Sequence, residues 1–225
     1  ATAGAEPGVD ERGLIDLSAL PFVTIDYETS WDLDQALFIR ETDSGYEVFY
    51  ALADAAHFVR PGEPLFDEAM ERGTSYYLPG LVLPMLPEVL SEGVTSLLPR
   101  EFRRALVFRM ELDSEGVSRG TELLRAKIRS RAKLTYRGVQ HMLDFPAESA
   151  IRGQEYHRSL ELLARVGTLR MQLADRRDVV RYDRVGLRLR LSEDGHRIVA
   201  SPEVRTAVQL YNEQISLLCN TEGAK

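Results

Sequence analysis

The hydrophobic periodicity of this chain changes near residue 136, and that change constrains the fold more than any other feature. Before it, apolar residues tend to alternate with polar ones in short segments, which predicts β-strands. After it, they recur every three or four positions, which predicts helices. Because strands and helices do not alternate strictly, the pattern favours an α+β fold with a mixed sheet and packed helices over a doubly wound parallel sheet. The predicted strands cover 22–26, 31–41, 45–54, 104–113 and 123–134, and the helices 136–143, 155–177 and 203–220.

Four segments need a separate interpretation. Residues 65–73 predict a short helix that ends at Gly73. Residues 74–87 contain three prolines, too many for a central strand or a helix interior, and predict an irregular packed loop. Residues 186–201 predict a β-hairpin around a Ser-Glu-Asp-Gly turn. The small and polar residues 1–13 predict a flexible lead-in.

Composition excludes several classes of protein. The 225 residues are 44% hydrophobic and 28% charged, which is ordinary for a globular protein with a sizeable core. No segment approaches the roughly 18 apolar residues of a membrane helix, and the N-terminus lacks an apolar secretory segment, so we expect no membrane partner. Cys219 is the one cysteine, which excludes a disulfide framework and agrees with a cytoplasmic location.

The distribution of charge is uneven. The net charge of −7 argues against a nucleic-acid partner, but residues 99–137 carry 11 Lys/Arg and 5 Asp/Glu, a local balance of +6. Within that segment, basic residues occupy every second position, so on a strand they would share one face and could follow the phosphates of single-stranded nucleic acid. An edge strand protected by positive charge is the alternative. These residues are Arg125, Lys127, Arg129, Arg131 and Lys133.

Three aspartates, Asp26, Asp32 and Asp34, fall within nine residues and are followed by Gln35. Mg²⁺ prefers hard oxygen ligands, and two cations about 4 Å apart are a common arrangement for phosphodiester cleavage. Asp32 and Asp34 would point to the same side of an extended segment, and Asp26 would reach them if the chain folds back. Aspartates also form turns and caps, so spacing alone leaves both interpretations open.

The segments around this cluster resemble, in order, the catalytic RNB domain of the ribonuclease II/ribonuclease R family. The matching blocks are LIDLSALPFVTIDYETSWDLDQA, ALADAAHFVRPGEPLFDEAMERGTSYYLPGLVLPMLPEVLSEGVTSLLP, IRSRAKLTYRGVQHML and YNEQISLLCN, which cover most of residues 14–220. The resemblance implies that residues 14–225 form an RNB-type catalytic domain. It also implies a 3′-to-5′ exoribonuclease that uses Mg²⁺, or Mn²⁺, to hydrolyse single-stranded RNA to nucleoside 5′-monophosphates.

The resemblance also implies roles for individual residues. Four aspartates of the family motif hold the metal ions. Asp26, Asp32 and Asp34 match the first three, with Asp34 beside the scissile phosphate, and Gln35 stands in place of the fourth.

Aromatic residues match the RNA path of the family. Tyr136 matches a tyrosine beside the 3′-terminal nucleotide, and Glu213 matches a glutamate that senses the ribose 2′-hydroxyl with it. Tyr77 matches an aromatic on the RNA path, and Tyr182 matches its stacking partner. Core packing is the alternative for each aromatic.

Two departures from the family leave alternatives open. An amide at Gln35 can ligate Mg²⁺ but brings no charge, which predicts a weaker metal site or a silent RNA-binding module. The family's later arginine-containing segment and its flanking OB-type domains have no match in the sequence, so we expect a fragment or an incomplete family member. We expect a monomer. The four histidines show no metal-ligand spacing; they are His57, His141, His157 and His196.

Overall fold

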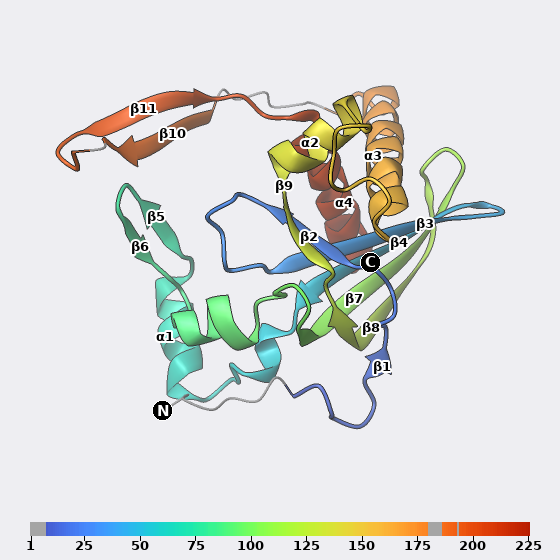
Figure 1. Ribbon diagram of the computed structural model, residues 1–225. Coiled ribbons are helices and arrows are strands. Elements are labelled where there is room, and N and C mark those ends of the chain that lie inside the picture. The colour runs from blue at the N-terminus through green and yellow to red at the C-terminus, as the bar shows by residue number, and fades with distance from the viewer. Residues whose placement is uncertain (1–7, 180–185, 193) are drawn as a thin grey trace.

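A seven-stranded mixed sheet organises the computed structural model, which describes residues 8–179, 186–192 and 194–225 (Figure 1). The strands are β1 (Ile15–Asp16), β2 (Val23–Asp26), β3 (Gln35–Thr42), β4 (Gly45–Ala53), β7 (Phe102–Asp113), β8 (Ser118–Arg129) and β9 (Ala132–Thr135). Their order is β1-β8-β7-β4-β3-β2-β9. The outermost pairings, β1 with β8 and β2 with β9, are parallel, and the four inner pairings are antiparallel.

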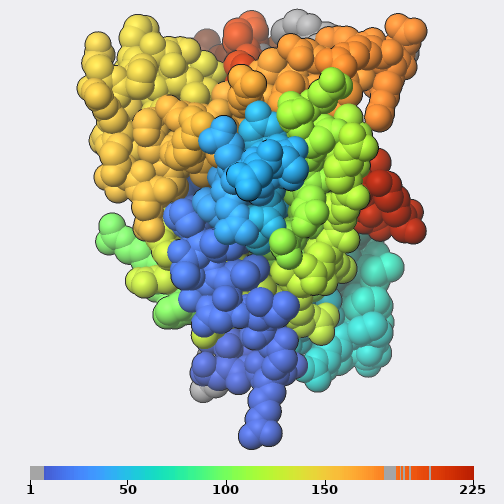
Figure 2. Space-filling view, turned by 90° about the vertical axis from the view of Figure 1, so that its right-hand side faces the viewer, coloured from blue at the N-terminus to red at the C-terminus, as the bar shows by residue number. Residues whose placement is uncertain are grey.

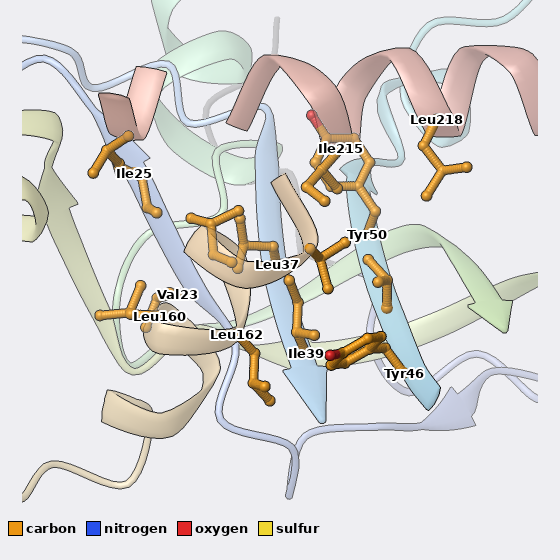
Figure 3. Packing of buried hydrophobic residues seen from close by; sticks show 14 of the residues in the cluster. Val23, Ile25, Leu37, Ile39, Tyr46, Tyr50, Leu160, Leu162, Ile215 and Leu218 are labelled. Carbon is orange, nitrogen blue, oxygen red and sulfur yellow. The ribbon is translucent and has the colours of Figure 1, made fainter. Parts of the chain in front are cut away.

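Three helices cover one face of the sheet, and both faces are buried. Along β4, Tyr46, Val48 and Tyr50 pack toward the helices, while Phe49 and Ala51 belong to a second cluster on the other face. Figure 3 shows the first cluster, in which side chains from the strands meet those from the helices. Because both faces of β4 are covered, its sequence is a nearly continuous apolar run. The three helices are α2 (Tyr136–Asp144), α3 (His157–Arg176) and α4 (Ala207–Gly223).

The sheet curls so that its two edges approach each other. Only Ser130 and Arg131 separate β8 from β9, although these strands lie five places apart in the strand order. In a flat sheet that separation would be about 24 Å, whereas the connection spans at most about 11 Å. The Arg131 N–H donates to the carbonyl of Phe22, just before β2, at 2.7 Å. The edge near β8 and the edge formed by β9 therefore meet at Ser130.

This curl corrects the prediction of one strand over 123–134. The strand ends at Arg129 because the chain turns there toward the other edge of the sheet, and Arg131 lies in the turn. Consequently the five alternating basic residues do not form one uninterrupted row. Arg125, Lys127 and Arg129 share a face of β8, and Lys133 belongs to β9.

A hairpin replaces the irregular loop predicted over 74–87. It consists of β5 (Tyr76–Leu78) and β6 (Leu81–Leu83), with Pro79 and Gly80 in the turn. Gly80 has φ +78°, a conformation that suits glycine, and Pro84 follows β6 rather than interrupting it. The prolines thus bound the strands instead of breaking them.

The other predicted elements are confirmed, with shifted ends. The short helix is α1 (Pro64–Arg72), which ends at Gly73 with φ +69°. The C-terminal hairpin pairs β10 (Gly186–Leu191) with β11 (Ile198–Glu203). Helix α4 begins later than predicted because Thr206 and Gln209 form a capping box. Two short helical turns, η1 (Ala55–His57) and η2 (Val89–Val94), complete the elements.

The lead-in is attached to the sheet from Gly8 onward. The buried Arg104 donates to the Gly8 carbonyl at 2.8 Å and pairs with Glu11, and it also lies 3.1 Å from the buried Asp54. At the far end of the sheet, Gly45 pairs with Asp113, so the β3–β4 and β7–β8 turns lie side by side (Figure 2). Among the described residues, no helix is both long and apolar enough to cross a membrane.

Candidate active site

The predicted metal ligands lie in the connection between β2 and β3, which we call the aspartate loop (residues 26–34). Asp26 ends β2, and Gln35 begins β3, so strand β3 starts later than predicted. The side chain of Leu33 is buried, and its carbonyl accepts from Leu97 N–H at 2.8 Å. The Ser96 hydroxyl accepts from Leu33 N–H at 3.0 Å and donates to the Trp31 carbonyl at 2.6 Å. These contacts fix the centre of the loop from the segment before β7.

Lys133 holds the other side of the aspartate loop. Its ammonium group donates to the Glu28 carbonyl at 2.7 Å and lies 4.7 Å from the centroid of the Trp31 ring. A cation over an indole face and a charged donor on a carbonyl both stabilise the loop conformation. Lys133 was predicted from the sequence to belong to a row of RNA-binding residues. In this structure it instead positions the loop that carries the aspartates.

The three aspartates lie close enough to affect one another electrostatically. The pKa of Asp34 is raised, first by loss of hydration and then by the negative charges of Asp26 and Asp32. Asp26 accepts from the Ser30 hydroxyl at 2.9 Å and from the Tyr27 N–H at 2.6 Å. The loop therefore collects like charges, which an ordinary turn would not need.

Tyr77 reaches the same loop from the β5–β6 hairpin. Its hydroxyl donates to Asp32 Oδ2 at 2.6 Å, and that hydrogen bond, followed by partial burial, raises the pKa of Tyr77 to about 12. The side chain is 66% exposed, so the ring is accessible to a ligand. The hairpin thus places an aromatic surface beside the carboxylates.

Gln35, in the position of the fourth family aspartate, contacts a buried tyrosine. Its Oε1 accepts a hydrogen bond from the Tyr50 hydroxyl, to which Ser216 of α4 is also hydrogen-bonded. Tyr50 is only 2% exposed, and this burial raises the pKa of its hydroxyl. The amide therefore connects the aspartate loop to the interface between β4 and α4.

The donor set fits a divalent cation in its chemistry. Three carboxylates and an amide oxygen are hard ligands, and a cation would offset the loss of hydration and the repulsion that together raise the pKa of Asp34. Within the part of the chain that the structure describes, no group of three or more His, Cys, Asp or Glu side chains is arranged to hold a metal ion. Asp26 and Asp32 are each engaged by a hydroxyl, so cation binding requires these contacts to rearrange.

A second group of polar and aromatic residues surrounds Tyr136, the first residue of α2. Burial and then the charge of Asp26 raise the pKa of Tyr136. Asn212 of α4 donates to its hydroxyl at 3.5 Å, and the Tyr27 ring meets the Tyr136 ring edge-on with centroids 5.5 Å apart. The Tyr27 hydroxyl in turn accepts from Gln209 at 3.1 Å. Helix α4 is thereby connected to the aspartate loop.

Sequence reasoning missed Asn212 and Tyr27. A signal for Asn212 was present, since Val208, Asn212 and Ile215 recur at helical spacing on the buried face of α4. Glu213, which was predicted to act with Tyr136, forms an ion pair with Arg205 in this structure. Tyr182 lies outside the described residues.

The remaining basic residues of the predicted row have protein partners. Arg125 lies 3.6 Å from Asp54, and Lys127 lies 2.9 Å from Asp16. Arg129 and Arg131 lie where the two edges of the sheet meet.

Comparison with known proteins identifies the family. A model of the RNB domain matches residues 14–225, so the chain belongs to the RNB domain family. Ribonuclease R of Vibrio parahaemolyticus is 33% identical over 213 residues, which cover 94% of this chain and 26% of that protein. Ribonuclease R of Escherichia coli is 43% identical over 145 residues, which cover 63% of this chain and 18% of that protein. The chain thus spans about a quarter or less of the length of these relatives.

A solved structure confirms the α+β class and the mixed sheet. The RNase R of Mycoplasma genitalium, in complex with double-stranded RNA, matches with a TM-score of 0.89 and 27% identity, over 97% of this chain and 39% of that chain. The same protein, in complex with ribose-methylated single-stranded RNA, also matches with a TM-score of 0.89. These complexes show RNA bound to a protein with this fold.

Proposed function

We propose that this chain carries the metal-binding and 3′-end-binding part of an exoribonuclease active site. The reaction is hydrolysis of single-stranded RNA from the 3′ end to nucleoside 5′-monophosphates, with Mg²⁺ or Mn²⁺ as cofactor. Membership of the RNB family supports the class of reaction. The observation that carries the proposal is the convergence of Asp26, Asp32 and Asp34 on one loop, where Tyr77 donates a hydrogen bond to Asp32 and the neighbouring charges help to raise the pKa of Asp34.

Asp26, Asp32 and Asp34 would hold the metal, with Gln35 at the edge of the site. When bound, Mg²⁺ would activate water and stabilise the charge that develops on the leaving oxygen. Ser96 and Lys133 fix the backbone of the loop, while the hydroxyls that engage Asp26 and Asp32 would have to give way to the metal.

The substrate side of the site would consist of the tyrosines. Tyr136 and Tyr27 offer rings and hydroxyls beside Asp26, close to where a terminal ribose would lie. Asn212 orients the Tyr136 hydroxyl, which could hydrogen-bond a ribose 2′-hydroxyl and so favour RNA over DNA. The exposed ring of Tyr77 would stack on a base.

The direct test is incubation with 5′-labelled single-stranded RNA and Mg²⁺, followed by electrophoresis. We expect a ladder of stepwise shorter RNA, no shortening in EDTA, and much slower shortening of the matching DNA. The assay should use both this chain and the product of the whole reading frame that contains it. Intact RNA with both proteins would refute the exoribonuclease proposal.

A silent RNA-binding module is the second candidate, and the contact between Gln35 and Tyr50 favours it. An amide engaged by a buried hydroxyl adds no charge to the metal site. Replacing Gln35 with Asp separates the candidates. A working enzyme should change its rate or metal requirement, whereas a silent module should stay inactive. A cytoplasmic location and a monomeric state remain predictions.

A further inference from the structure

A basic cavity of about 590 Å³ lies where β8 meets β9, apart from the aspartate loop. The β2–β9 pairing matches Val23 with Ala132 and Asp26 with Thr135, so the cavity and the loop lie at opposite ends of one strand pair. Three residues along a strand separate these ends by about 10 Å. The side chains that matter at the cavity are Arg100, Arg129, Arg131, Gln154, Glu155 and Tyr156.

Hydrogen bonds to backbone carbonyls hold Arg100 and Arg129 close to each other. Arg100 has φ +70°, a conformation that residues other than glycine seldom adopt. Its N–H donates to the Ser130 carbonyl at 2.7 Å, and its carbonyl accepts from Arg129 Nε at 3.0 Å. These contacts hold an unfavourable backbone conformation at the rim of the cavity, where strain often accompanies function.

Arg131 completes the group. It lies 2.7 Å from Glu155, and it also donates to the carbonyls of Ser18, Ala19 and Arg129 at 3.1, 3.2 and 3.2 Å, so its charge lines the cavity while its hydrogen bonds go to the protein. Three guanidinium groups against one carboxylate leave the lining with two excess positive charges. This excess charge would favour an anion, and Glu155 already pairs with one of the three guanidinium groups.

An aromatic side chain, Phe102, pairs across the strands with Arg129, which lines the cavity. Phe102 is 42% exposed, and Arg129 and Lys127 lie over its ring at 5.3 and 5.6 Å. Guanidinium groups bind phosphate through paired hydrogen bonds, and exposed aromatics stack on unpaired bases. The combination is typical of single-strand nucleic-acid surfaces rather than of sites for small anions.

We propose that this cavity is a second RNA-binding site, which holds a backbone phosphate of single-stranded RNA while Phe102 stacks on a base. It rests on the proposed function only in taking RNA as the ligand. The predicted basic row is thereby replaced by a convergent group, in which Arg129 and Arg131 are joined by Arg100 from before β7.

The test measures binding of a short fluorescein-labelled single-stranded RNA by anisotropy, in EDTA so that no hydrolysis occurs. R100N removes the charge with a residue that tolerates positive φ. We expect R100N to weaken binding about fivefold and to flatten the slope of log K against log salt by about 0.7. E155Q removes the competing carboxylate and should tighten binding by a similar factor.

The matched control is R119Q, the same loss of charge at the other end of β8, where Arg119 is exposed. It should bind RNA as the wild type does. Wild-type binding by R100N and E155Q, or an equal loss in R119Q, would overturn the proposal. So would R100N-sensitive binding of a polyglutamate peptide without binding of RNA.

The RNA-shortening assay on the same variants separates this proposal from the proposed function. If R100N and E155Q still shorten RNA and bind it with wild-type affinity, only the proposal for the cavity is overturned. If both variants change the RNA affinity but no protein shortens RNA, the proposal for the cavity is supported and only the exoribonuclease proposal is overturned.

Discussion

Two regions of this molecule place aspartates in opposite electrostatic surroundings. At the β1–β8 edge, Asp16 accepts from the Ser18 hydroxyl and lies 2.9 Å from Lys127, and these partners lower its pKa to about 2. In the aspartate loop, dehydration and two neighbouring carboxylates raise the pKa of Asp34 instead. The partners of Asp16 favour its charged form in the folded state, whereas the surroundings of Asp34 disfavour its charged form. That difference supports the proposal that the loop is the functional region.

The largest expected effect comes from replacing Asp34 with Asn. Mutating groups that hydrogen-bond to metal ligands typically costs about 10- to 100-fold in activity, so loss of Asp34, a proposed direct ligand, should cost more than about 100-fold. The measurement is the initial rate of RNA shortening at saturating Mg²⁺. D16N is the matched control and should retain the wild-type rate. Equal rates for D34N and D16N would remove the functional distinction between the two regions.

The substitution Gln35→Asp is expected to lower the Mg²⁺ requirement. An added carboxylate raises the charge of the ligand set, so the Mg²⁺ concentration for half-maximal activity should fall about tenfold. A metal titration of the shortening rate measures this shift. Tyr50→Phe, which removes the hydroxyl that engages Gln35, serves as a companion and should cost about 1 kcal/mol of stability. An unchanged metal requirement in Q35D would exclude position 35 from the metal site.

Lys133→Met should loosen the aspartate loop without changing its carboxylates. Loss of the hydrogen bond to Glu28 and of the contact with Trp31 should cost about 1 kcal/mol. Trp31 is the one tryptophan of the sequence, so its fluorescence reports on this loop directly. We expect a shifted emission in K133M and wild-type emission in K225M, a control at the C-terminus. Identical emission from K133M would show that Lys133 does not position the loop.

The smallest effects concern how stability depends on pH. They should have opposite signs in the two regions. The pKa of Asp34 is raised above 3.8, so the folded state binds more protons and the free energy of unfolding falls as pH rises through that window. The pKa of Asp16 is lowered to about 2, so its stabilisation is complete above 3.8 and is lost as pH falls toward 2. At neutral pH without metal, D34N should therefore melt above the wild type and D16N below it.

Thermal denaturation in EDTA across a pH series measures both differences. The D16N difference should vanish near pH 2, and the D34N difference should vanish below the ordinary aspartate value of 3.8. Two shifts of the same sign would contradict the electrostatic contrast.

Local patterns predicted the elements well where local chemistry decides them. Gly73 ends α1, and the spacing of Val208 and Ile215 places the buried face of α4. The break at Ser130 was not predictable, because it depends on curling of the whole sheet. The β5–β6 hairpin was missed because prolines were counted without knowing which of them occupied the turn.

The residues of the candidate site were proposed from the sequence and stay predictions, whereas the contacts among them came from the structure. The aspartates and Tyr77 were predicted from the sequence, and the structure places Tyr77, on the β5–β6 hairpin, in contact with the aspartate loop. The pairing of Gln35 with Tyr50 joins residues on neighbouring strands, and that of Tyr136 with Asn212 joins two helices. Such long-range pairs leave no signal in the spacing of residues along the sequence. They could therefore be identified only from the structure.

Calorimetric titration of Mn²⁺ into the metal-free protein tests the central claim most directly, with D34N and D16N beside the wild type. We predict that the wild type and D16N bind Mn²⁺ and gain thermal stability from it, because the cation relieves repulsion among Asp26, Asp32 and Asp34. D34N should lose most of this binding. No binding by the wild type, or equal binding by D34N, would contradict the account.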